Sequence, residues 1–313
     1  MKVIDSSFQE VKDSENSYSN TYNQVIDFLK TRVNDEQLLS QLIANCDHSI
    51  LQLTDGKTYT ILSHDGQFKR YNYPSSAAAF KTNIAISSKE NEVLIIPGIA
   101  LRPNYNNHQL VHELLHVITT NQHNYFNENG VVYTKTGTRI DYYDRELNNY
   151  YIENNPSSDG LNEGITEYLA TIITNECVGN YPHYHVIASI LMACNDKLLN
   201  AYLSNDVKSL ELFYEDLENK QSVISREDLC KLETENLSDE ELAKIIVGGL
   251  KYNKAYNNEV DISWITNYLD KYYMLNSGSW SDLITSSLEK YEGNNSMLPK
   301  NRWWHLKIKT IVI

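Results

Sequence analysis

The chain has 313 residues, of which 41% are hydrophobic, and this is enough to build one large domain or two lobes around a buried core. Its formal net charge of −14 disfavours binding to nucleic acid or to an anionic membrane, because both surfaces repel an acidic protein. No CxxC pair occurs, so neither a disulfide framework nor a cysteine zinc site is expected from the four cysteines, Cys46, Cys177, Cys194 and Cys230.

The N-terminal sequence MKVIDSSFQEVKDSENS predicts no secretory signal, since acidic and polar residues interrupt the apolar stretch that a signal needs. The longest apolar runs, such as VLIIPGIAL from Val93, are too short to span a bilayer as a helix. We therefore expect a cytoplasmic protein with reduced thiols. Its composition predicts no particular oligomeric state.

The first hundred residues predict two helices and then a small, mostly antiparallel sheet. Apolar residues recur at helical spacing over 25–33, and a second helix is expected over 36–44. Over 49–101 the pattern changes to short β-type runs separated by turn signals, namely SILQLT, TYTILS, FKRYNY, NIAIS and EVLIIP. The dipeptide Pro97-Gly98 is a turn signal and predicts the end of the last strand.

From residue 107 onward the apolar spacing becomes helical and predicts a mainly α-helical C-terminal lobe. The expected helices span 109–119, 161–175, 184–202, 207–217, 239–252, 262–273 and 281–291. Ser238 and Glu241 form a capping box that opens one of them. An insertion over 121–160 contains GVVYTKTGTRIDYYD, which alternates like a β-hairpin. The fold class expected is α+β, with an N-terminal part over 1–106 and a helical part over 107–313 that together form one two-lobed unit.

One stretch of the helix expected over 109–119 has clear chemical meaning, since residues 110–120 read LVHELLHVITT. His112 and His116 are four residues apart, so they project from one helix face and can bind the same metal ion, with Glu113 beside them. The alternative is an amphipathic helix with two surface histidines. The neighbouring residues are apolar, however, which predicts a buried position where polar side chains need partners such as a metal.

A third ligand has to come from elsewhere, and two of the three candidates are out of register. A metzincin-type histidine would stand at position 122, where this chain has Gln122, with His123 one residue later. An aspzincin-type aspartate would be Asp141 of GTRID, which is also displaced by one residue. Asp141 is kept as the alternative ligand.

The third candidate is LNEGITEYLA over residues 161–170. Glu163 and Glu167 lie four residues apart and hence on one helix face, and Gly164 leaves room for the close approach of another helix. Glu163 would supply a charged oxygen ligand. Glu167, one turn later, would accept a hydrogen bond from the free ring nitrogen of a zinc histidine and so fix its orientation.

Together, HELLH and LNEGITEYLA resemble the gluzincin zinc metallopeptidases, distantly the thermolysin and aminopeptidase N families, over roughly 25 residues. The resemblance implies a zincin-like fold and one catalytic zinc ion bound by His112, His116 and Glu163. It also implies hydrolysis of a peptide or protein substrate by a zinc-activated water that Glu113 deprotonates. The 47-residue separation of His116 and Glu163 is longer than in those families, so the insertion has to loop out.

The same resemblance implies further features of an active site. The amino-terminus-binding string of the aminopeptidases is absent, so an endopeptidase is expected. A Tyr or His outside the motifs would stabilise the charged intermediate, and we favour Tyr184. His108 is too far along the helix to share the ion, about 12 Å from His116, and is expected to line the cleft. The strand EVLIIP is expected to form the sheet edge that binds an extended peptide.

Two other function classes remain open at this point. A non-catalytic zincin-like binding protein would keep the fold but lose a ligand or the base, and the intact set of five motif residues argues against it. A purely helical interaction module would account for the C-terminal helices but would leave both motifs as coincidence.

Overall fold

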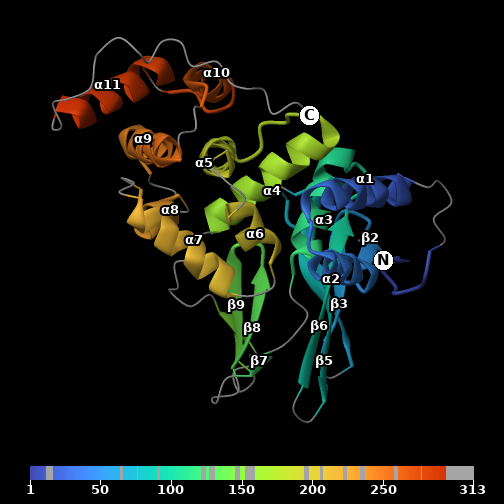
Figure 1. Cartoon of the computed structure of the whole chain (residues 1–313). Helices are drawn as coiled ribbons and strands as arrows, with labels where there is room; N and C mark the ends of the chain where they lie inside the picture. The colour runs from blue at the N-terminus through green and yellow to red at the C-terminus, as the bar shows by residue number, and fades with distance from the viewer. Residues whose placement is uncertain are drawn as a thin grey trace. The chain divides into compact units, whose positions relative to one another are not determined.

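The computed structural model describes residues 1–11, 17–63, 66–75, 77–89, 92–120, 125–126, 131–144, 149–151, 159–193, 197–204, 207–220, 224–232, 237–256, 260–275 and 277–293 (Figure 1). The fold is α+β, as expected, and the chain forms two compact units. The first unit comprises Met1–Asn155, Leu169–Cys177 and Leu203–Asn205, and the second comprises Pro156–Tyr168, Val178–Tyr202 and Asp206–Ile313.

The first unit contains a six-stranded sheet with the order β1-β2-β6-β5-β3-β4. Its strands are β1 (Lys2–Ile4), β2 (Ile50–Leu53), β3 (Thr58–Leu62), β4 (Phe68–Asn72), β5 (Ala79–Lys89) and β6 (Glu92–Leu101). The β5–β6 and β3–β4 pairs are antiparallel, whereas β1–β2, β2–β6 and β3–β5 are parallel. The sheet is therefore mixed rather than mostly antiparallel, because strands separated by long connections can return in the same direction.

Strand β6 continues through Pro97-Gly98, so the turn expected there is wrong. Gly98 pairs with β2 on one side and with β5 on the other. Proline cannot donate a ladder hydrogen bond, and the register of β5 shifts between Asn83 and Ala85, next to the partner Pro97. A β-bulge therefore accommodates the proline within the strand.

Helix α3 (Asn107–Ile118) carries the first motif and is built into the first unit. It begins with a capping box, in which the Asn106 side chain accepts from the Gln109 N–H and the Gln109 side chain accepts from the Asn106 N–H. It contacts β5 and β6, and also α1 (Ser17–Arg32) and α2 (Glu36–Asp47). These contacts bury its apolar residues on several sides.

The hairpin expected within the insertion is confirmed. Strands β8 (Val131–Thr136) and β9 (Arg139–Asp144) pair antiparallel around Gly137, whose φ of 58° suits glycine. Strands β7 (Tyr125–Phe126) and β10 (Asn149–Tyr151) complete a four-stranded sheet. The rest of the insertion, including His123, lies outside the described residues.

Helix α4 (Asp159–Thr174) carries the second motif and belongs to both units, since residues 159–168 group with the second and residues 169–174 with the first. The other helices of the second unit are α5 (Pro182–Met192), α6 (Lys197–Leu203), α7 (Val207–Asn219), α8 (Arg226–Lys231), α9 (Asp239–Ala255), α10 (Ile262–Tyr272) and α11 (Trp280–Gly293). The capping box of Ser238 and Glu241 opens α9, as expected.

The single helix expected over 184–202 is wrong, because α5 and α6 are separate helices that meet at 119°. Helix α5 ends at Met192 with Ala193 as its C-cap, and α6 begins at Lys197. Among the described residues, no single helix is long and apolar enough to span a membrane, although this bent pair reaches that length and composition together.

Candidate metal centre

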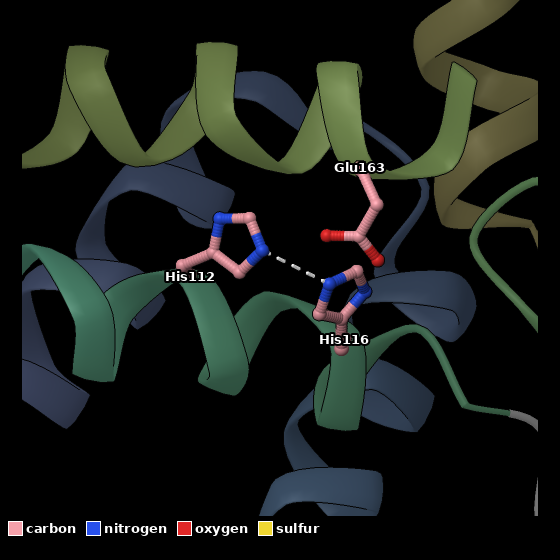
Figure 2. Close-up of side chains that lie close together, drawn as sticks. All are labelled: His112, His116 and Glu163. Carbon is pink, nitrogen blue, oxygen red and sulfur yellow. Dashed lines mark hydrogen bonds between the residues drawn. The ribbon is translucent and has the colours of Figure 1, made fainter. Parts of the chain in front are cut away.

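The two motif histidines point their ring nitrogens at each other from adjacent turns of α3 (Figure 2). The Nε2 atoms of His112 and His116 are 3.2 Å apart, and the two residues are only 6% and 5% exposed. Two nitrogens that each lie about 2.0–2.1 Å from a tetrahedral zinc ion are about 3.3 Å apart. The observed separation therefore fits a shared ion, as the i, i+4 spacing predicts.

Glu163 of α4 completes a group of three possible ligands, and Figure 2 shows its carboxylate directed toward His116. One ligand atom from each of His112, His116 and Glu163 lies within 4.8 Å of the others. Glu163 is half-buried, whereas both histidines are buried. Two imidazoles and one carboxylate are a common ligand set for catalytic zinc, so the donor atoms fit this metal.

The alternative ligand Asp141 lies on β9, where it pairs with Thr134 of β8. The Asp141 side chain lies outside the described part of the chain. Of the two candidate third ligands, only Glu163 has a described side chain, and its carboxylate oxygen lies beside the two histidines.

Glu113, the expected general base, is held by the neighbouring sheet. Its Oε2 atom accepts a hydrogen bond of 2.5 Å from the backbone N–H of Lys81 on β5. Lys81 pairs with Ile99 of β6, beyond the EVLIIP stretch that was expected to line the site. The strand that contacts Glu113 is thus β5. Nothing in the sequence around Lys81 indicated this contact.

Hydroxyl groups connect the hairpin to the end of α3. The Lys81 ammonium donates to Thr136 Oγ1 at 3.2 Å, and the Thr136 and Thr120 hydroxyls are 3.0 Å apart. Thr120 in turn donates to the His116 carbonyl at 2.7 Å. The Thr136 end of the hairpin is therefore hydrogen-bonded to β5 and to Thr120, directly after α3.

Glu167 follows Glu163 by one turn of α4 and is completely buried, with 0% of its surface exposed. A buried carboxylate requires hydrogen-bond donors, which is consistent with a partner such as an imidazole N–H. Its pairing with a zinc histidine stays a prediction.

Tyr184 of α5 packs against the turn of α4 that carries Glu163. A methyl group on Gly164 would collide with the Tyr184 carbonyl group, and one on Gly160 would lie 3.0 Å from the Tyr184 ring. The close approach expected at Gly164 is therefore confirmed. The Tyr184 ring also lies beside the rings of Tyr181 and His183. Its role as a hydrogen-bond donor to substrate stays a prediction.

Three other histidines near the motifs are buried or half-buried. His108 does not line a cleft: it is completely buried, and its Nδ1 lies 3.1 Å from Thr174 Oγ1 of α4. Burial lowers the pKa of His183 to about 4, so its ring is neutral at neutral pH. His185 is buried with its Nδ1 3.3 Å from the Tyr268 hydroxyl.

Comparisons with protein-family models, with curated proteins and with solved structures found no match to this chain. A function for the protein therefore has to be inferred from its own side chains.

Proposed function

We propose that this protein is a zinc-dependent metallopeptidase that binds one zinc ion through His112, His116 and Glu163. The observation that carries the proposal is the buried pair of Nε2 atoms 3.2 Å apart, with a carboxylate oxygen in the same group. Three protein ligands leave a fourth position open, as catalytic zinc sites do. When bound, zinc would supply a Lewis acid and lower the pKa of a water molecule to about 7.

Glu113 is next to His112 in the sequence and would act as the general base. Its Oε2 accepts the Lys81 N–H. The Glu113 carboxylate would take a proton from the attacking water and pass it to the leaving amine. The backbone hydrogen bond would hold the carboxylate in one orientation during both transfers.

Two further residues would assist the reaction. Tyr184 would donate its hydroxyl proton in a hydrogen bond to the negative oxygen of the tetrahedral intermediate. Glu167 would accept a hydrogen bond from the N–H of a zinc histidine and keep the ring in its binding orientation. The packing of Tyr184 on Gly160 and Gly164, and the complete burial of Glu167, support these assignments.

A peptide or protein segment is the proposed substrate, bound as an extended strand. Residues 79–83 of β5 pair with β6 on one side. Strand β3 pairs with β5 at Ala85, and its Tyr59 ring packs edge-on against Phe80 of β5. The Lys81 N–H of this stretch donates to Glu113. The substrate would bind beside Glu113, and the net charge of −14 favours basic or neutral sequences.

The decisive experiment combines metal analysis with a change of the base. The purified protein should contain about one zinc per chain. Glu113→Gln should keep the metal and abolish cleavage of a denatured protein substrate, because the amide cannot take the proton. A native protein without zinc, or full activity of Glu113→Gln, would refute the proposal.

A matched pair of variants identifies the third ligand. Glu163→Ala should empty the site, whereas Asp141→Ala should leave the zinc content unchanged. The reverse result would favour the aspzincin-type peptidase. Zinc binding without any Glu113-dependent hydrolysis would favour a non-catalytic binding protein.

A further inference from the structure

His108 and Thr174 form a buried contact between α3 and α4, the two helices that carry the candidate ligands. The Thr174 hydroxyl donates to the Ala170 carbonyl at 2.8 Å and accepts from the Glu176 N–H at 3.2 Å. The Thr174 hydroxyl also lies 3.1 Å from His108 Nδ1. With its single proton directed to the Ala170 carbonyl, the hydroxyl would accept a hydrogen bond from a His108 ring protonated on Nδ1.

The contact lies on the same helix faces as the candidate metal centre. At 100° per residue, His108 shares a face of α3 with His112 and His116. Thr174 likewise shares a face of α4 with Glu163 and Glu167. The polar row on each helix thus extends beyond the metal ligands to the His108–Thr174 hydrogen bond.

The connection has a mechanical consequence for Glu163. Helix α4 is continuous, and its residues 169–174 belong to the same unit as α3. Glu163 lies 11 residues before Thr174, or about 16 Å along the helix axis. If α4 pivoted at this end by roughly 5°, the Glu163 backbone would move by about 1.4 Å, whereas metal–ligand distances tolerate about 0.2 Å.

We propose that His108 is a positioning residue, which holds α4 through Thr174 and thereby places Glu163 at ligand distance from His112 and His116. It would act through Thr174 and α4 and not as a ligand, since it lies about 12 Å along the helix axis from His116. The inference rests on the proposed zinc site and assigns a role to a histidine that this site does not use.

A matched pair at position 174 tests the proposal. Thr174→Val removes the hydroxyl at nearly constant volume, and Thr174→Ser retains it. Zinc affinity would be measured on the full-length folded chain by competition with a chelator, together with the visible spectrum of the cobalt(II)-loaded protein. Thr174→Val should bind zinc about tenfold more weakly and show a reduced cobalt band, while Thr174→Ser should stay within about twofold of wild type.

A second pair keeps the test informative if Thr174→Val does not fold. The side-chain amide nitrogen of the His108→Asn variant can occupy the position of Nδ1. In the His108→Gln variant, the amide nitrogen lies near the position of Nε2 instead. His108→Gln should therefore weaken zinc binding, and His108→Asn should weaken it less. Wild-type zinc affinity and cobalt spectrum in folded Thr174→Val or His108→Gln would overturn the positioning role, even if their melting temperatures fall.

Failure of the underlying proposal would look different. A wild-type chain that binds no zinc, or whose zinc does not depend on Glu163, would overturn the metal centre and the positioning role together. If the wild-type chain binds zinc through Glu163, and the variants at positions 174 and 108 bind it equally well, the positioning role alone would be overturned.

Discussion

Gly164→Ala tests the packing that places Glu163 in the structure. The added methyl would lie 2.6 Å from the Tyr184 carbonyl carbon, whereas non-bonded carbons prefer about 3.5–4.0 Å. Helix α5 would therefore have to withdraw by roughly 1 Å. Overpacking costs about 1–3 kcal/mol, and the upper part of this range applies because a backbone carbonyl cannot rotate away.

Alanine is more favourable than glycine in a helix by up to about 1 kcal/mol, which offsets part of this cost. The net loss of unfolding free energy should therefore be about 1–2 kcal/mol. The melting temperature should then fall by about 2–8 °C, measured by circular dichroism with and without zinc. Gly249→Ala is the comparison variant within another buried helix, since its methyl would lie 2.9 Å from Ile190 Cγ2 and 3.7 Å from Ile190 Cβ, which are side-chain atoms and not backbone. A Gly164→Ala protein as stable as wild type would refute the close packing of α4 and α5.

Three other outcomes are expected. Lys81→Pro removes the N–H that holds Glu113 and should lower kcat about 10- to 100-fold with zinc content unchanged. Lys81→Ala retains this N–H and serves as the control. Equal activities of the two variants would argue against the hydrogen bond. Zinc at a thousandfold excess over its Kd should add about 4 kcal/mol to the unfolding free energy, and His112→Ala should abolish this gain in a titration followed by urea denaturation. Burial lowers the pKa of His183 from 6.5 to about 4, so its contribution to the unfolding free energy is complete above pH 6.5 and declines toward pH 4. His183→Gln should therefore reduce the pH dependence of the unfolding free energy between pH 4 and 6.5. An unchanged slope in this range would contradict the burial of a neutral ring.

Local patterns in the sequence were sufficient for most helices and for the hairpin. The capping box at Ser238 marks the start of α9, and the alternation around Gly137 marks the β8–β9 hairpin. Both signals depend on residues a few positions apart, so they survive without knowledge of the rest of the fold.

Two local signals were misleading because tertiary pairing outweighed them. Pro97-Gly98 is typical of a turn, but pairing with β2 and β5 keeps the strand continuous, with a bulge opposite the proline. The spacing over 184–202 predicts a single helix, yet the structure has two helices, α5 and α6, at 119° to each other. Periodicity alone does not show where two buried helices are joined.

His112, Glu113 and His116 could be placed from the sequence because a single helix fixes their relative positions. Glu163 could be proposed from its own motif, but the 47 residues that separate it from His116 say nothing about which helix faces meet. The Lys81–Glu113 and His108–Thr174 hydrogen bonds likewise join residues 32 and 66 positions apart. Only the tertiary structure decides such contacts, because they depend on how separate elements pack together and not on the spacing within any one of them.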